Sequence, residues 1–297
     1  MAKPRVSAER GEAVARTGTT LFDSHLHLTA ARFVPDLDEV VDRARARGVR
    51  LMVTVASDPE DAGEAVALAA RTPGLWATAG LHPHAADRTS TSLMDEIERI
   101  AEAPEVVAIG ETGLDFHYDN ADRRAQLENF EAHLGLAARL GLPIIVHSRS
   151  AEAETAERVR EYGDGAAGVL HCFTGGEALL DAALDADWYV SFSGLLTFVP
   201  ELAEWARAVP AHRLLIETDA PYLAPAPRRG RRNEPAYLAH TCRRLAEVCG
   251  VAFEEAAALT AENARRFYRL AAHGEAPLRS SAAASAGVRH GPWEGAA

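Results

Sequence analysis

Short apolar runs alternate eight times with Ala- and Leu-rich segments between residues 20 and 271. Those segments carry charges at helical spacing, as in "DLDEVVDRARARG" and "ADRRAQLENFEAHLGLAARLG", and Gly48 and Gly141 lie where a glycine commonly ends a helix. Eight β/α alternations in about 250 residues favour a parallel barrel. None of the runs has the polar composition of an edge strand, which a closed barrel does not need. We therefore predict an α/β fold of the (β/α)8 TIM-barrel class, with a doubly wound sheet as the alternative. The predicted strands are Thr20–His25, Leu51–Ala56, Leu75–Gly80, Val106–Gly110, Pro143–His147, Gly168–His171, Trp188–Phe192 and Arg213–Glu217.

The domain organisation follows from the two ends of the chain. Residues 1–19 are polar and predict a flexible lead-in, and residues 272–297, rich in Ala, Ser and Gly, predict a disordered tail. The barrel domain is expected to span residues 20–271. No apolar run approaches the ~20 residues that span a bilayer, and the start has no apolar signal segment. Three cysteines cannot form a fully paired disulfide framework, so we expect a cytoplasmic protein that binds no membrane.

Charge and lysine content exclude two classes of protein. A net charge of −12 argues against coating of duplex DNA by bulk electrostatics, although bound metal ions can supply positive charge locally to a nucleic-acid enzyme. The only lysine is Lys3, in the polar lead-in. Chemistry that needs a buried lysine, such as a Schiff base or a carbamylated lysine that bridges two metals, is therefore excluded.

Histidines and acids gather at the carboxyl ends of the predicted strands, where TIM barrels place their active sites. A single strand-end histidine often does no more than satisfy a backbone carbonyl, but six of the 12 histidines share this position. The whole set therefore indicates a functional site. The six other histidines (His117, His133, His212, His240, His273 and His290) are interpreted as solvated or packed. The strand-end set is His25, His27, His82, His84, Glu111, His147, Arg149, His171, Glu217 and Asp219.

The stretch "LFDSHLHL" indicates what this site binds. Side chains at i and i+2 of a strand share a face, so His25 and His27 aim at one point. Four imidazoles and two carboxylates exceed the roughly four ligands of a tetrahedral zinc and suit two divalent ions about 3.5–4 Å apart. With no lysine available, Glu111 is the predicted bridge. Nitrogen and oxygen ligands without thiolate admit Zn, Mn, Co or Ni, and Mg at the more oxygen-rich position. The predicted ligands are His25, His27, Glu111, His147, His171 and Asp219.

The motifs that carry these residues resemble those of the TatD family of metal-dependent hydrolases. That family is one of the amidohydrolase-like TIM barrels. The resemblance implies a (β/α)8 fold, a two-metal centre and phosphodiester hydrolysis on DNA, often as a 3′→5′ exonuclease. The matching strings occur in order over about residues 20–270: "DSHLHL", "GLHPH", "IGETGLDF", "PIIVHSR", "VLHCFTG", "SFSGLLTF", "ETDAPYLAP" and "RRNEPAYL".

The resemblance also implies roles position by position. One metal would be held by His25, His27, Glu111 and Asp219. The second would be held by Glu111, His147 and His171. His82 would lie near the scissile phosphate, and Glu217 would either orient the metal site or bind an additional, third ion. Two positions depart from the family pattern: Val199 stands where a basic residue is common, and Thr29 where an acidic one is common.

These roles predict hydrolysis of DNA, single-stranded or at 3′ ends, by a water that two ions activate. Asp219 would accept the proton of that water, and His82 would stabilise charge on the phosphoryl oxygens. The catalytic residues would be Asp219, Glu111 and His82. The predicted phosphate contacts are His82, His84, Arg149 and Arg232, the last from a cluster with Arg228, Arg229 and Arg231 for which a solvated surface loop is the alternative.

The sequence leaves two other functions open. The same water-activating centre would serve an ester or amide hydrolase, such as a deacylase or lactonase, because fold and metals do not name the substrate. A protein that binds metal or DNA without turnover is the second alternative, and Asp219 beside an open two-metal arrangement argues against it. No stable protein partner is implied.

Overall fold

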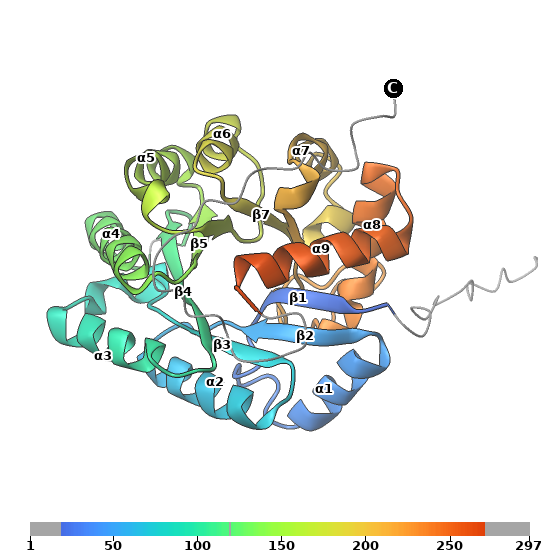
Figure 1. The fold of residues 1–297 in the computed structure, drawn as a ribbon, viewed down its shortest axis with the longest axis horizontal. Coiled ribbons are helices and arrows are strands. Elements are labelled where there is room, and N and C mark those ends of the chain that lie inside the picture. The colour runs from blue at the N-terminus through green and yellow to red at the C-terminus, as the bar shows by residue number, and fades with distance from the viewer. Residues whose placement is uncertain (1–18, 119, 271–297) are drawn as a thin grey trace, which may run out of the picture.

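The computed structural model describes residues 19–118 and 120–270. Its eight strands are hydrogen-bonded in sequence order, and every adjacent pair is parallel. Helices surround this ring of strands (Figure 1). The predicted (β/α)8 barrel is therefore confirmed. The strands are β1 (Leu21–Leu26), β2 (Val49–Thr54), β3 (Leu75–Ala79), β4 (Val106–Asp115), β5 (Ile144–Arg149), β6 (Gly168–Leu170), β7 (Tyr189–Phe192) and β8 (Leu214–Ile216). The helices are α1 (Leu37–Ala46), α2 (Pro59–Arg71), α3 (Thr91–Ala101), α4 (Arg123–Leu140), α5 (Glu152–Tyr162), α6 (Glu177–Asp185), α7 (Leu202–Ala208), α8 (Leu238–Cys249) and α9 (Phe253–Phe267).

The first and last strands meet through hydrogen bonds at and beyond the end of β8. The Ser24 hydroxyl donates to the carbonyl of Ile216 at 3.0 Å. Beyond β8, the Asp219 N–H donates to the carbonyl of His25 at 2.9 Å, and the His27 N–H donates to the carbonyl of Ala220 at 2.7 Å. The barrel is thus nearly closed, and its closure brings the histidines of β1 beside the acids that follow β8.

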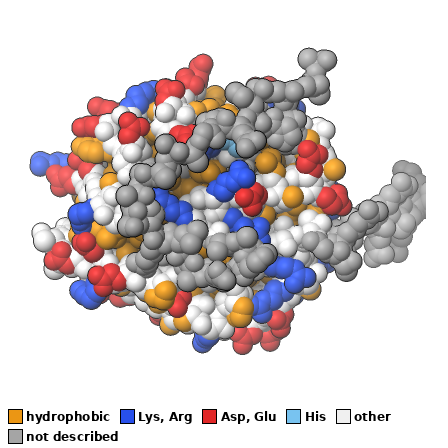
Figure 2. All heavy atoms as spheres, in the orientation of Figure 1, with side chains coloured by type: hydrophobic (Ala, Val, Ile, Leu, Met, Phe, Trp, Pro, Cys, Tyr) orange, Lys and Arg blue, Asp and Glu red, His pale blue; other side chains and the backbone are white. Residues whose placement is uncertain are grey.

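Helix α9 covers the amino end of the barrel. It lies across the ring of strands in Figure 1, and its residues Phe267 and Ala264 belong to an apolar cluster with residues of all eight strands. Phe22, near the start of β1, stacks between Trp76 and Tyr268, with ring centroids 6.1 and 6.0 Å apart. Since this end is filled with apolar side chains, the polar strand-end residues lie at the opposite, carboxyl end. In the same orientation, Figure 2 shows acidic and basic side chains interspersed over the visible surface.

All eight predicted strands exist, and seven have both ends within two residues of the prediction. The exception is β4, which runs to Asp115 although the prediction ended it at Gly110. Its extension, "ETGLD", contains Gly113 at φ +124°, where a Cβ atom would collide with the carbonyl oxygen of His147 in β5. Glycine therefore lets β4 continue against β5 beyond the predicted end at Gly110.

The two predicted helix ends are confirmed, and the predictions for the two terminal segments are not tested. Gly48 and Gly141 follow α1 and α4 with φ of +86° and +64°, as expected of glycines that end helices. The lead-in 1–19, apart from Thr19, and the tail 272–297 lie outside the described residues, so both remain predictions. Among the residues that the structure describes, no helix combines the length and apolar character needed to cross a bilayer.

Candidate metal centre

Glu111 stands at the middle of the site, and its two carboxylate oxygens face different imidazoles. Oε1 lies 2.8 Å from Nε2 of His171 and 3.0 Å from Nδ1 of His147. Oε2 lies 3.4 Å from Nε2 of His25 and 3.8 Å from Nε2 of His27. A carboxylate that divides its oxygens between two pairs of nitrogens has the arrangement of a bridge between two cations.

Asp219 completes the β1 side of the centre. Its Oδ1 lies 3.3 Å from Nε2 of His27 and 3.8 Å from Nε2 of His25. Three groups of ligand atoms are each compact enough to hold an ion. They are His25, His27 and Asp219; His25, Glu111 and His171; and His82, Glu111 and His147. The structure thus brings together all six residues that the sequence predicted as ligands.

The spacing of the ring nitrogens fits metal coordination. Nε2 of His25 and Nε2 of His27 are 3.3 Å apart, and Nδ1 of His147 and Nε2 of His171 are 3.2 Å apart. Two ligands bound tetrahedrally to zinc at 2.0–2.1 Å have nitrogens about 3.3 Å apart. Both pairs therefore have the separation of neighbouring ligands on one ion.

The outer nitrogens of two imidazoles are held by oxygen atoms. Nδ1 of His27 donates to the carbonyl of Val55 at 2.8 Å, so in the neutral ring Nε2 keeps its lone pair for a cation. Nδ1 of His171 lies 3.2 Å from Oε1 of Glu217, which is fully buried, and its Nε2 points to Glu111. Outer-sphere carbonyls and carboxylates of this kind fix the tautomer and orientation of metal-binding histidines.

Asp115 supports the β5 side and was not assigned a role from the sequence. Its Oδ2 lies 3.3 Å from Nε2 of His147 and 2.8 Å from Nε2 of His84. The same carboxylate accepts hydrogen bonds from the N–H groups of His117 and Tyr118. The sequence did hold one signal for this role, the spacing along β4. Asp115 stands four residues after Glu111 in the same strand and so shares its face.

His82 differs from His27 and His171 in its tautomer. Its Nδ1 accepts a hydrogen bond from the N–H of His84 at 3.1 Å, so the proton of the neutral ring lies on Nε2. Burial lowers the pKa of His82 and outweighs the nearby Glu111 carboxylate, which keeps the ring neutral. Its Nε2, 3.6 Å from Oε1 of Glu111, is therefore a hydrogen-bond donor at the edge of the centre.

Asp23, which precedes the two histidines of "DSHLHL", does not face the centre. Its Oδ1 accepts from the N–H of Thr218 at 2.8 Å, and its Oδ2 accepts from the hydroxyl of Thr218 at 2.5 Å. Burial raises the pKa of Asp23 to about 8. Because Thr218 immediately precedes Asp219, Asp23 positions the turn that carries the candidate base.

The charges in the centre call for a cation. Burial opposes ionisation of Glu111, but His171 and its neighbouring imidazoles outweigh burial and hold the pKa of Glu111 well below its usual range. Burial would lower the pKa of His27, yet its contact with Asp219 raises that pKa to about 9. Glu111 and Glu217 likewise raise the pKa of His171 well above 6.5 against the effect of burial. Buried carboxylates thus draw positive charge to the ring nitrogens, and divalent ions would supply it in place of protons.

Two arginines predicted to contact phosphate lie in different surroundings. The guanidinium of Arg149 is exposed and lies over the ring of Tyr118, 4.6 Å from its centroid. The guanidinium of Arg232 contacts Oδ1 of Asp36 at 2.6 Å and Oε1 of Glu234 at 3.0 Å. This network ties the segment after β1 to the segment after β8. Phosphate binding by Arg232 stays a prediction that would require it to leave these carboxylates.

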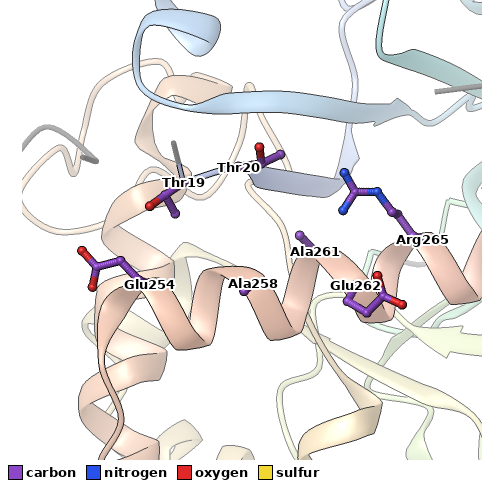
Figure 3. Close-up of a pocket in the computed structure, with 7 residues that line it drawn as sticks. All are labelled: Thr19, Thr20, Glu254, Ala258, Ala261, Glu262 and Arg265. Carbon is purple, nitrogen blue, oxygen red and sulfur yellow. The ribbon is translucent and has the colours of Figure 1, made fainter. Parts of the chain in front are cut away.

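A surface pocket at the amino end of the barrel is separate from this centre. It lies between α9 and the residues that lead into β1, as Figure 3 shows with Thr20, Glu262 and Arg265. No histidine is among its described lining residues. The candidate metal centre is therefore not this pocket but the cluster at the carboxyl ends of the strands.

Comparisons with known proteins identify relatives of this chain. Residues 22–269 match the family described as "TatD related DNase". The chain is 41% identical over 260 residues to the "3'-5' ssDNA/RNA exonuclease TatD" of Pantoea vagans. The aligned region covers 84% of this chain and 100% of that protein. It is 38% identical over 254 residues to the "Uncharacterized metal-dependent hydrolase YabD" of Bacillus subtilis, covering 84% of this chain and 99% of that protein. The crystal structure of YJJV, a TatD homolog from Escherichia coli K12, matches with a TM-score of 0.80 at 26% identity, covering 84% of this chain and 98% of that one.

The fold, the cluster of imidazoles and carboxylates, and these matches define a metal-dependent hydrolase built on a TIM barrel. Within that class the chain belongs to the TatD family, as its motifs predicted.

Proposed function

We propose that this protein is a nuclease that removes nucleotides from the 3′ ends of DNA, using two divalent ions. The observation that carries the proposal is the division of the Glu111 oxygens between the His25–His27 pair and the His147–His171 pair. The relative from Pantoea vagans, whose name is that of a 3′-5′ single-strand exonuclease, supports the substrate class.

Six side chains would hold the ions, with Zn, Mn or Mg as the candidates. Bound there, two divalent ions would activate a water for attack on phosphorus and neutralise the phosphoryl oxygens. One ion would lie with His25, His27, Glu111 and Asp219. The other would lie with Glu111, His147 and His171. The Cys172 thiol lies 3.2 Å from the hydroxyl of Ser193 and belongs to none of the three groups of ligand atoms, so it is not among the candidate ligands.

The other residues of the centre have roles that follow from their protonation. Contact with His27 outweighs burial and lowers the pKa of Asp219, so this carboxylate is ionised and can accept the proton of the attacking water. The N–H at Nε2 of His82 can donate to a phosphoryl oxygen that gains charge. Arg149 and His84 are the further candidates for phosphate contact. The three free cysteines support action in the cytoplasm.

The test is the substitution Glu111→Gln, which keeps the shape of the side chain and removes its charge. Assayed on a 5′-labelled single-stranded DNA with Mn, Mg or Zn, it is expected to lower cleavage about 100-fold or more, because the amide has no negative charge and only one oxygen, so it cannot bridge both ions. The exposed Glu128→Gln in α4 is the matched control and should leave the rate unchanged. Undiminished cleavage by Glu111→Gln would reject the assignment.

The products and the choice of substrate test the rest of the proposal. A ladder that shortens by one nucleotide at a time from the 3′ end supports an exonuclease, and internal fragments would reject that polarity. Acyl and lactone substrates in the same metal-loaded preparation are the comparison. Their hydrolysis without cleavage of DNA would replace the nuclease by an ester or amide hydrolase.

A further inference from the structure

Two exposed tyrosines stand on opposite sides of the metal centre. Tyr118 follows β4 and is 53% exposed, and Tyr222 follows β8 and is 51% exposed. In a ring of eight strands in sequence order, β4 and β8 are four strands apart and therefore face each other across the barrel mouth. Large aromatic side chains exposed at such a site are candidates for ligand contact.

A continuous row of ring contacts joins the two tyrosines through the centre. At one end the ring of Tyr222 meets His27 edge-to-face, with centroids 5.9 Å apart. At the other end the ring of Tyr118 meets His84 edge-to-face at 5.5 Å. The centroid distances between are His27–His25 5.0 Å, His25–His171 3.9 Å, His171–His147 5.4 Å, His147–His82 5.2 Å and His82–His84 4.3 Å. A chain that lies along this row passes over the ion-binding atoms and reaches a tyrosine on either side.

The Tyr118 end also carries a cation. The guanidinium of Arg149 lies 4.6 Å from the centroid of the Tyr118 ring, and within residues 19–118 and 120–270 it has no carboxylate partner at ion-pair distance. A charged guanidinium on an exposed aromatic ring is a combination that binds a base together with its neighbouring phosphate.

We propose that Tyr118 and Tyr222 are stacking platforms for unpaired bases on the two sides of the scissile phosphate of a single-stranded nucleic acid. The inference rests on the proposed nuclease function and adds how the strand is held. Aromatic side chains stack on unpaired bases with little sequence preference, whereas the bases of a duplex are already stacked on each other. A chain with a net charge of −12 gains little from bulk attraction to nucleic acid, so such local contacts would supply the affinity.

The experiment compares two 5′-labelled single strands with the metal-loaded enzyme. One has normal bases, and the other has abasic tetrahydrofuran residues at its 3′ terminus and at the four positions before it. Tyr118→Ala and Tyr222→Ala are each expected to raise KM for the normal strand about 5- to 150-fold, the range of alanine substitutions at base-stacking residues. KM for the abasic strand should stay at the wild-type value, since it has no base to stack. Phenylalanine at either position should restore the wild-type KM.

Two controls separate stacking from structural effects. Tyr162→Ala removes a 37% exposed tyrosine at the carboxyl end of α5, on the amino side of the barrel, and should change neither KM. Affinity for Mn, measured on the same variants, should stay constant if the tyrosines do not position His27 and His84. Strands with a single abasic residue show which tyrosine receives the base on the 5′ side and which the base on the 3′ side.

The outcomes distinguish this inference from the function on which it rests. If the wild type cleaves neither strand, the nuclease function is rejected and the stacking proposal with it. If the wild type cleaves the normal strand and Tyr118→Ala and Tyr222→Ala behave like it, stacking alone is overturned. Equal losses on the normal and abasic strands would also overturn stacking and make the tyrosines positioning residues for His84 and His27.

Discussion

Replacing His133 is expected to change how the stability of the barrel depends on pH. His133 lies in α4, is fully buried, and accepts a hydrogen bond at Nε2 from the N–H of Leu81 at 3.1 Å. Its Nδ1–H donates to the carbonyl of Asn129 at 2.8 Å. The ring must therefore be neutral to make both bonds, and burial lowers the pKa of His133 to about 4. Leu81 directly precedes His82, so this buried imidazole also holds the backbone that leads into the metal centre.

The sign and size of the effect follow from the two pKa values of His133. In the unfolded chain a histidine titrates near 6.5, so between pH 6.5 and 4 the unfolded state binds the proton and the folded state does not. The contribution of neutral His133 is complete above pH 6.5, falls as the pH drops towards 4, and changes no further below 4. The whole loss over this interval is about 3 kcal/mol. In His133→Leu this loss is absent, but the Leu81 N–H is left without a partner, which costs about 1–3 kcal/mol at every pH.

The assay is urea unfolding of chelator-treated wild type and His133→Leu at a series of pH values from 7 to 4. The wild type should be more stable at pH 7, and its advantage over the variant should shrink by about 3 kcal/mol as the pH falls to 4. The exposed His117→Leu controls for the removal of an imidazole as such. Parallel losses in the wild type and His133→Leu across this range would refute the reasoning, because they would show that His133 takes up its proton equally in both states.

Three further substitutions test the supports of the centre and the barrel. Glu217→Ala is expected to lower the affinity for Zn or Mn about 10- to 100-fold, because His171 loses the acceptor that orients it. Equilibrium dialysis should then show an unchanged number of bound ions, whereas the loss of one ion would assign Glu217 to an additional, third ion. Gly113→Ala should destabilise the protein by about 2 kcal/mol or more in urea, since its Cβ collides with the backbone of β5, and an unchanged midpoint would contradict that clash. Asp23→Ala should lower the free energy of unfolding by about 2–3 kcal/mol in thermal unfolding, because the buried N–H and hydroxyl of Thr218 lose their acceptors. Asp23→Asn retains an acceptor and should recover most of this loss.

The convergence of the candidate ligands was predictable because two simple rules apply to these residues. Alternation along a strand puts His25 and His27 on one face, and parallel strands end at the same edge of a barrel. Both rules apply without any knowledge of which residue each side chain contacts in the folded protein. The same rules could not give the true end of β4, since "ETGLD" continues as strand only where β5 offers a backbone that a glycine can approach.

The supporting role of Asp23 was beyond the reach of the sequence for a physical reason. Asp23 and His25 stand two positions apart in β1, yet Asp23 bonds to Thr218, nearly two hundred residues away, and His25 faces Glu111. Which of the two faces the candidate metal centre depends on how the chain after β8 closes against β1. That pairing is a property of the folded barrel and leaves no local pattern in the sequence.

The chemistry of His27 and His82 is set by the atom on the far side of each ring, and this explains why residue type alone could not separate candidate ligands from donors. His27 has a carbonyl oxygen at Nδ1, which places its proton there and leaves Nε2 free for a cation. Nδ1 of His82 accepts a hydrogen bond from the backbone N–H of His84. The proton of the neutral ring is therefore on Nε2, which makes the ring a donor. Both are strand-end histidines of one site, and they differ only in whether the neighbouring backbone offers oxygen or nitrogen. A barrel can thus build cation ligands and a phosphate donor from the same side chain, because the backbone of each loop decides which nitrogen carries the proton.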